Sequence, residues 1–206
     1  MIERFLKVRG MARRAADSES GGIREALGRY LGKMRGRTAE GPPPVPLREI
    51  LWSWLGACCG IGTLSLLNQV FLPSGDNLLL FGSFGASAVL VYGAPRAPLS
   101  QPRNLVGGHL ISATIGVIFF QTIGFLPWLA APLAVATAIA LMHLTRTLHP
   151  PGGATALIAV AGSDHIHALG FFYIFLPVGV GVLVLLLVAL LINNLASQRQ
   201  YPEHWR

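Results

Sequence analysis

The fold prediction rests on HPPGGATALI, residues 149–158. Its second part, GATALI at 153–158, matches GASAVL at residues 85–90 in the pattern G-A-[S/T]-A followed by two aliphatic residues. Each copy lies in a short apolar segment, at about 78–93 and 149–162, that is rich in Gly, Ser or Thr at its start. Neither segment is long enough for a plain membrane span, because a helix needs about 20 residues to cross the hydrocarbon core.

Four longer apolar segments surround the two short ones. They cover about 49–71, 104–125, 127–144 and 168–193. The order is long, short, long in residues 49–125 and again in residues 126–195. Because three is an odd number, the second half enters the membrane from the opposite side. The sequence therefore predicts an all-α polytopic membrane protein with six membrane segments, arranged as two inverted three-segment repeats with two short broken helices.

The short segments suggest where a substrate binds. We expect residues 78–84 and 149–153 to be extended, with short helices starting near Gly85 and Gly153 close to the membrane centre. Non-helical backbone at that depth is tolerated only beside protein or a water-filled cavity. The start of a helix carries partial positive charge and unpaired N–H groups. Two such starts meeting predict a site for a small anion.

Charge separates a basic arm from the apolar body. Charged residues make up 12% of the 206 residues and hydrophobic residues 52%, which excludes an ordinary soluble domain. Most of the 16 Lys and Arg residues lie in residues 1–48, which we interpret as a cytoplasmic arm ending in a proline-rich linker. An apolar stripe within it suggests a basic amphipathic helix on anionic lipid, and a disordered tail is the alternative. The stripe consists of Ile23, Leu27, Tyr30, Leu31 and Met34.

Arginine placement gives the orientation. If all six segments cross and the arm is cytoplasmic, Arg96, Arg103, Arg146 and the tail at 196–206 also lie on the cytoplasmic side. No signal peptide is visible at the start of the chain. We therefore expect a multi-pass protein of a bacterial inner membrane with cytoplasmic N- and C-termini.

Residues 149–157, HPPGGATAL, resemble the signature of the HPP family of integral membrane proteins. FGASAVL at 84–90, QPRN at 101–104 and the Gly108-His109 pair are also similar to that family, so the resemblance covers about 49–195. Members in plastids and cyanobacteria are linked to nitrite transport, so the resemblance implies a transporter or channel for nitrite. The family is often described as having four spans, and the two short segments account for the difference from six.

Eight residues form the predicted substrate site. Ser87 and Thr155 would add hydroxyl donors, while His149 and Arg103 would act toward the cytoplasmic side. His109 is a candidate because ionisable groups inside a membrane are costly. Alternatively, the histidines only orient backbone and Arg103 only sets topology. The predicted set is Gly85, Ser87, Arg103, His109, His149, Gly152, Gly153 and Thr155.

Other functions find less support in the sequence. We expect no enzyme activity, cofactor or metal: His165 and His167 beside Asp164 offer too few ligands. The formal charge of +7 suggests nucleic acid, but no aromatic and basic reading surface accompanies it, so we expect no nucleic-acid partner. Two alternatives stay open, a non-transporting scaffold that binds lipid or a partner, and a proton or cation conductor using histidines. The oligomeric state is also open, a homo-oligomer included.

Overall fold

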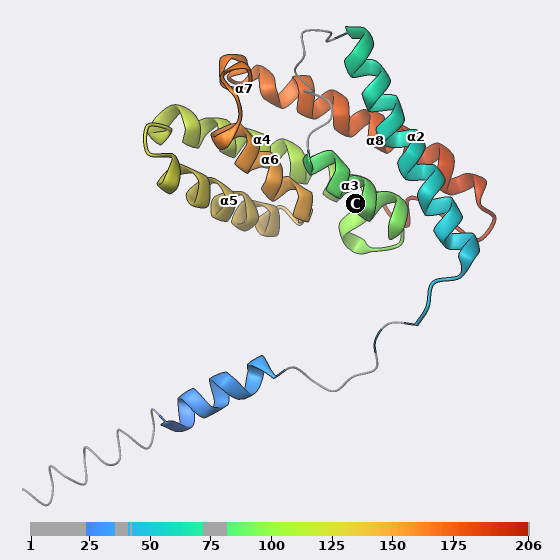
Figure 1. Ribbon diagram of the computed structural model, residues 1–206, viewed down its shortest axis with the longest axis horizontal. Helices are drawn as coiled ribbons and strands as arrows, with labels where there is room; N and C mark the ends of the chain where they lie inside the picture. The colour runs from blue at the N-terminus through green and yellow to red at the C-terminus, as the bar shows by residue number, and fades with distance from the viewer. Residues whose placement is uncertain (1–23, 36–40, 42, 72–81, 206) are drawn as a thin grey trace, which may run out of the picture. The chain divides into compact units, whose positions relative to one another are not determined.

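The computed structural model describes residues 24–35, 41, 43–71 and 82–205 (Figure 1). The chain divides into two units, Met1–Pro44 and Val45–Arg206. In the first unit, residues 24–34 form a helix. Ile23 and the rest of the arm before it lie outside the described residues.

The second unit is a bundle of helices, which confirms the all-α class. Its main helices are α2 (Leu47–Phe71), α3 (Gly82–Gly93), α4 (Pro102–Ile123), α5 (Pro127–Leu144), α6 (Pro150–Ala161) and α8 (Val180–Leu195). Three short elements connect them: η1 (Pro98–Ser100), α7 (Asp164–Leu169) and the π-helical η2 (Ile174–Gly179). Four runs are long and apolar enough to cross a membrane, namely α2, α4, α5 and Ile174–Leu195, and α3 and α6 are shorter apolar helices.

The prediction that extended backbone precedes each short helix is wrong where the structure describes those residues. Helix α6 starts at Pro150, and only His149 before it has extended backbone (φ −139°, ψ 104°). Proline suits a helix start, because its fixed φ is helical and the N–H that it lacks would have no partner inside the helix. Residues 82–84 are already helical in α3, while residues 78–81 lie outside the described part of the chain.

The last apolar segment, expected as one span over 168–193, is broken. Helix α7 ends at Leu169 and is followed by Gly170, whose φ of +50° favours glycine. The helical run that follows is interrupted inside η2 at Leu176 (φ −130°, ψ 118°), directly before Pro177. Proline disfavours helical backbone in the residue before it, which explains the break.

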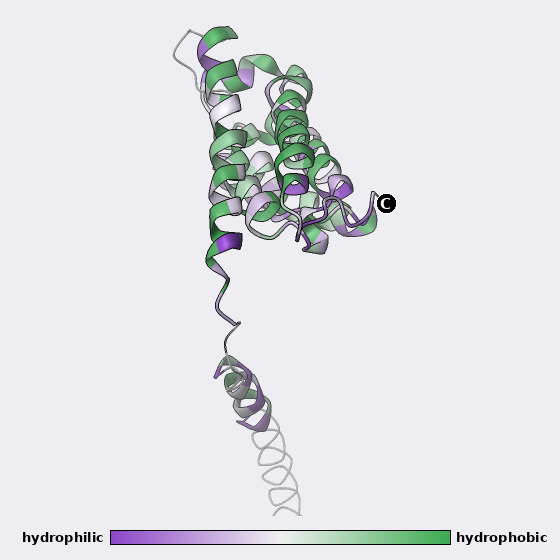
Figure 2. Cartoon of the chain, turned by 90° about the vertical axis from the view of Figure 1, so that its right-hand side faces the viewer, coloured by the Kyte–Doolittle hydropathy of each residue, from purple (hydrophilic) through white to green (hydrophobic). Residues whose placement is uncertain are grey.

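Polar contacts gather helix ends at one end of the bundle. The Arg199 guanidinium, just beyond α8, donates to Glu49 Oε2 at the start of α2 (2.8 Å). The Arg103 guanidinium at the start of α4 donates to the Thr145 carbonyl, just after α5 (2.6 Å). Helices α2 and α4 therefore begin at this end, whereas α5 and α8 end there, and Figure 2 shows hydrophilic segments near this end against a mostly hydrophobic bundle.

Helices α4 and α6 approach each other through glycine. A Cβ on Gly108 would lie 2.5 Å from His149 Cβ and 2.9 Å from the Thr147 carbonyl oxygen. A Cβ on Gly152 would lie 2.8 Å from Ser112 Oγ and 2.9 Å from the Gly108 carbonyl oxygen. Neither position has room for a side chain, so glycine sets the spacing of these two helices.

Substituting Gly108→Ala should lower the thermal stability of the protein. The added methyl group meets backbone, and such overpacking costs about 1–3 kcal/mol. Gly62→Ala is the control, because nothing lies within 4 Å of a Cβ on this exposed α2 residue. Thermal unfolding of both purified variants in one detergent should show a lower melting temperature for Gly108→Ala alone. Equal melting temperatures would contradict the close α4–α6 contact.

Candidate functional site

Four of the predicted residues meet in a buried polar cluster. Ser87 Oγ of α3 lies 2.7 Å from His109 Nε2 of α4 and 2.9 Å from His149 Nε2, just before α6. The other nitrogen of His109, Nδ1, lies 2.7 Å from Thr155 Oγ1 of α6. All four residues are fully buried. The two short helices and α4 are thus joined by side chains that the sequence places far apart.

Hydrogen-bond chemistry orders this cluster. His149 Nδ1 lies 2.8 Å from the Leu99 carbonyl oxygen, which only accepts, so Nδ1 carries a proton. In the neutral ring, Nε2 then accepts from the Ser87 hydroxyl. Having donated, Ser87 Oγ accepts from His109 Nε2–H, and His109 Nδ1 accepts from Thr155. The result is one directed chain, Thr155 to His109 to Ser87 to His149 to Leu99, in which both rings are neutral and each donor has an acceptor.

The two hydroxyls occupy equivalent places in the repeated motif. Ser87 is the third residue of GASAVL and Thr155 the third residue of GATALI. They bind the two nitrogens of one ring, His109, from opposite sides. Each hydroxyl also lies near the carbonyl four residues earlier in its own helix: Ser83 for Ser87, and Pro151 for Thr155.

Ser83 is a second polar residue on the same face of α3. It lies four residues before Ser87, one helical turn away. Its side chain is buried, and its Oγ is without a hydrogen-bond partner among the described residues. The neighbouring Phe84 ring has its centroid 5.6 Å from that of His109. The first turn of α3 therefore holds an unsatisfied donor next to the histidine chain.

The other four predicted residues lie around the cluster rather than in it. Gly85 is exposed, with nothing within 4 Å of a Cβ, and Gly153 meets only Val135 at 3.8 Å. Gly152 is buried in the α4–α6 contact. Arg103 is exposed at the polar end of the bundle.

The start of α6 differs from the donor-rich helix start that the sequence suggested. Pro150 and Pro151 have no N–H, and the Gly152 N–H donates to the His149 carbonyl (2.8 Å). The first three helical residues of α6 thus offer no free backbone donor. Side chains, and the first turn of α3, carry the donors here.

Sequence reasoning missed the residues that close the polar end. Arg199 is almost fully buried and also donates to the Glu49 and Tyr92 carbonyls and to Asn193 Oδ1. Tyr201 is also buried, and burial raises the pKa of its hydroxyl. Part of the predicted tail at 196–206 thus packs into the bundle, through Arg199 and Tyr201. The only sequence signal for Arg199 and Tyr201 was their place in a polar stretch directly after an apolar segment.

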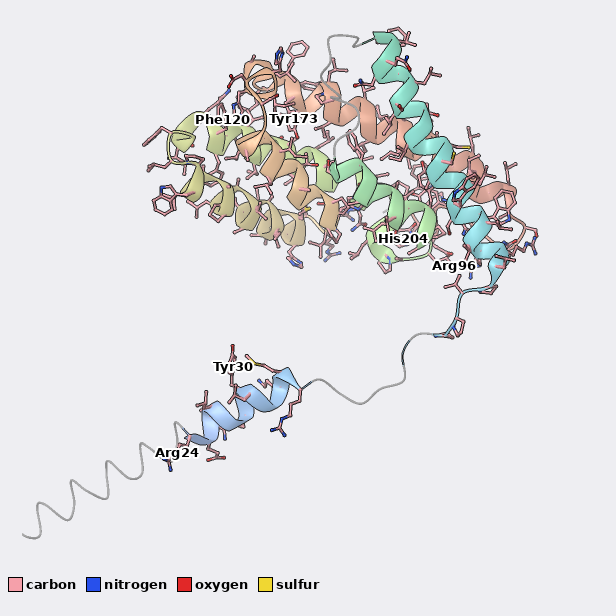
Figure 3. The ribbon with its side chains drawn as sticks, viewed as in Figure 1. Arg24, Tyr30, Arg96, Phe120, Tyr173 and His204 are labelled. Atoms are coloured by element: carbon pink, nitrogen blue, oxygen red, sulfur yellow. The ribbon has the colours of Figure 1, made fainter. Side chains whose placement is uncertain are left out.

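Tyr173, between α7 and η2, was also missed. Its buried hydroxyl donates to the Thr155 carbonyl (3.1 Å), so a further element contacts the cluster. Figure 3 labels Tyr173. His167, weighed as a metal ligand, instead stacks on Phe120 with ring centroids 3.7 Å apart. Within the described ranges no group of three or more His, Cys, Asp or Glu residues could hold a metal ion.

Comparison with known proteins gives a family. The family model "HPP, transmembrane region" matches residues 42–202. A transmembrane protein of Dictyostelium discoideum is 46% identical over 179 residues, which is 85% of this chain and 57% of the relative. A second transmembrane protein of that organism is 43% identical over 180 residues, 85% of this chain and 63% of the relative. The chain therefore spans less than two thirds of either relative. No solved structure matches it.

The directed chain predicts the tautomers of two histidines. His149 should carry its proton on Nδ1 and His109 on Nε2 at neutral pH. Nitrogen-15 NMR of histidine-labelled protein distinguishes the two forms, and His109→Gln and His149→Gln assign the signals. Finding the proton of His109 on Nδ1 would contradict the order, because His149 Nε2 would then have no donor.

Proposed function

The chain belongs to the HPP transmembrane-region family, and from this premise we propose that it carries a small inorganic anion, with nitrite the leading candidate, across a membrane. Nitrite follows from the family resemblance of the HPPGGATAL and QPRN motifs. The single observation that carries the anion site is the buried Ser83 hydroxyl on the first turn of α3, which has no hydrogen-bond partner within the described ranges.

All six main segments cross the membrane in this proposal, as two inverted repeats. In its favour, α3 and α6 each have 12 residues, while α4 and Ile174–Leu195 each have 22. The packing partners also correspond: α2 packs on α3 and α8, and α5 packs on α6 and α4. A two-fold exchange of the halves converts one set of contacts into the other. The equivalent hydroxyls of Ser87 and Thr155 on one ring fit the same exchange.

The polar end of the bundle faces the cytoplasm, by the excess of arginine there. Four arginines belong to this end: Arg48 and Arg96 contact residues 197–203, Arg103 contacts Thr145, and Arg199 contacts Glu49. Both termini are then cytoplasmic, and we place the protein in a bacterial inner membrane. Exposed Arg96 and Arg103 would concentrate anions at the entrance.

The anion binds at the first turn of α3 in this scheme. The first N–H groups of a helix have no partner inside the helix, and the dipole favours negative charge there. Ser83 adds a buried hydroxyl donor to that turn. His109 and Thr155 line the neighbouring chain of polar groups, which extends toward the polar end through Ser87 and His149.

The helix at residues 24–34 lies on anionic lipid in this proposal. Its apolar residues Leu27, Tyr30, Leu31 and Met34 are 50–63% exposed. Arg24, Arg29, Lys33 and Arg35 alternate with them along the same stretch. Apolar area and basic charge on one short helix are the combination that binds anionic membrane surfaces.

Ser83→Ala should reduce nitrite flux into proteoliposomes by about ten- to a hundredfold, the effect of losing one hydrogen bond to a charged group. Thr114→Ala is the matched control, because the Thr114 hydroxyl donates to the Leu110 carbonyl of its own helix. Chloride and potassium fluxes measure selectivity. Nitrite flux that is equal in the two folded variants would remove Ser83 from the site.

Backbone amides at residues 24–34 should exchange hydrogen more slowly in nanodiscs with anionic lipid than in neutral ones. Leu31→Glu places a charge on the apolar face and should abolish the difference. Lys33→Gln should reduce it, since a basic residue near an anionic surface contributes about 1 kcal/mol. Identical exchange in both lipids would favour the disordered-tail alternative.

A further inference from the structure

Each hydroxyl of the buried cluster has two acceptors within reach. Ser87 Oγ lies 2.9 Å from His149 Nε2 and 3.0 Å from the Ser83 carbonyl oxygen. Thr155 Oγ1 lies 2.7 Å from His109 Nδ1 and 3.5 Å from the Pro151 carbonyl oxygen. In the neutral chain both hydroxyls donate to histidine. The two backbone carbonyls are therefore alternative acceptors.

These alternative acceptors allow the cluster to rearrange its hydrogen bonds around an added proton. A proton on His109 Nδ1 needs an acceptor, which Thr155 Oγ1 becomes when its own hydrogen turns to the Pro151 carbonyl. His109 Nε2–H still donates to Ser87, and Ser87 still donates to His149. Every donor keeps an acceptor, so the cluster can hold one extra proton without leaving a buried polar group unsatisfied.

The charge can then move along the cluster by transfer at one oxygen. His109 Nε2–H gives its proton to Ser87 Oγ while the Ser87 hydroxyl proton passes to His149 Nε2. One N–H and one O–H bond break, and one of each forms. Afterwards Ser87 donates to His109, and His149 donates to Ser87 and Leu99. The positive charge has moved from α4 to the start of α6.

Within the described part of the chain, no charged side chain compensates this proton. Among the described residues no hydrogen bond or ion pair joins an acidic group to either ring. The other titratable groups of the surrounding helices are engaged or distant: the Tyr173 hydroxyl donates to Thr155, the Tyr92 hydroxyl donates to Leu185, and Arg103 and His143 are exposed. An uncompensated buried charge is costly.

We propose that the Thr155–His109–Ser87–His149 chain carries the coupling proton of anion transport. The inference rests on the proposed function, because the anion on the first turn of α3 supplies the missing counter-charge about one helical turn from Ser87. Proton and anion then stabilise each other in the site, and each must raise the affinity for the other by the same factor. The transported unit is one anion with one proton.

The test uses the full chain in proteoliposomes with the membrane potential clamped. Nitrite uptake and lumenal pH are followed together at mildly alkaline pH, where nitrous acid is scarce, and protein-free liposomes correct for its passive entry. An inward proton gradient should drive uphill nitrite accumulation, and inward nitrite should acidify the lumen. His109→Gln should reduce both nitrite accumulation and lumenal acidification at least tenfold. His143→Gln, which replaces an exposed histidine in α5, should leave both unchanged.

The outcomes separate the two proposals. Nitrite flux in the unaltered protein that leaves lumenal pH unchanged and ignores the gradient would refute proton coupling and keep anion transport. Proton movement without nitrite would refute coupling and favour the histidine conductor. No nitrite flux through folded protein would overturn the proposed function itself. The unaltered protein decides these cases even if His109→Gln does not fold, and unimpaired coupling in a folded His109→Gln would also refute the inference.

Discussion

Two imidazole rings and two hydroxyls are fully buried among apolar helices, and the packing of the bundle depends on satisfying them. A buried donor or acceptor without a partner costs about 1–3 kcal/mol. Here one chain of hydrogen bonds satisfies all four side chains, but only if α3, α4 and α6 approach closely. Gly108 and Gly152 make that approach sterically feasible. The polar chain and the glycine contact therefore require each other.

The two halves of the bundle are similar in packing but different in chemistry. GASAVL and GATALI place Ser87 and Thr155 on the same ring, yet the residues four positions earlier are Ser83 and Pro151. Serine leaves a hydroxyl at the start of α3 that no other described residue binds, whereas the proline pair removes backbone donors at the start of α6. In this interpretation the first half binds the anion, and the second, with His149, receives the proton.

Much of the fold, and the identity of the four residues that meet in the buried cluster, could be predicted from the sequence. Apolar segment lengths located the helices, and the paired motif indicated Ser87 and Thr155 as candidates. His149 came from the HPP stretch, and His109 from the cost of an ionisable group inside the membrane. Whether these side chains meet depends on how three helices are rotated about their axes, and a local sequence pattern does not specify that rotation. The helical start at Pro150 was missed because the proline pair was read as extended chain. Burial of Arg199 and Tyr201 was missed because their partners, such as Glu49 and Ser100, are distant in sequence.

The cluster lies between two groups of helices, which bears on how a closed site could open. Helix α2 packs with α3 and α8, and α5 packs with α4 and α6. Ser87 belongs to the first group, His109 and Thr155 to the second, and both His–Ser hydrogen bonds end on Ser87 Oγ. Rocking of one group against the other, as alternating access requires, would remake bonds at that oxygen. Because the same oxygen relays the proton, its protonation state and the separation of the two groups are linked at one atom.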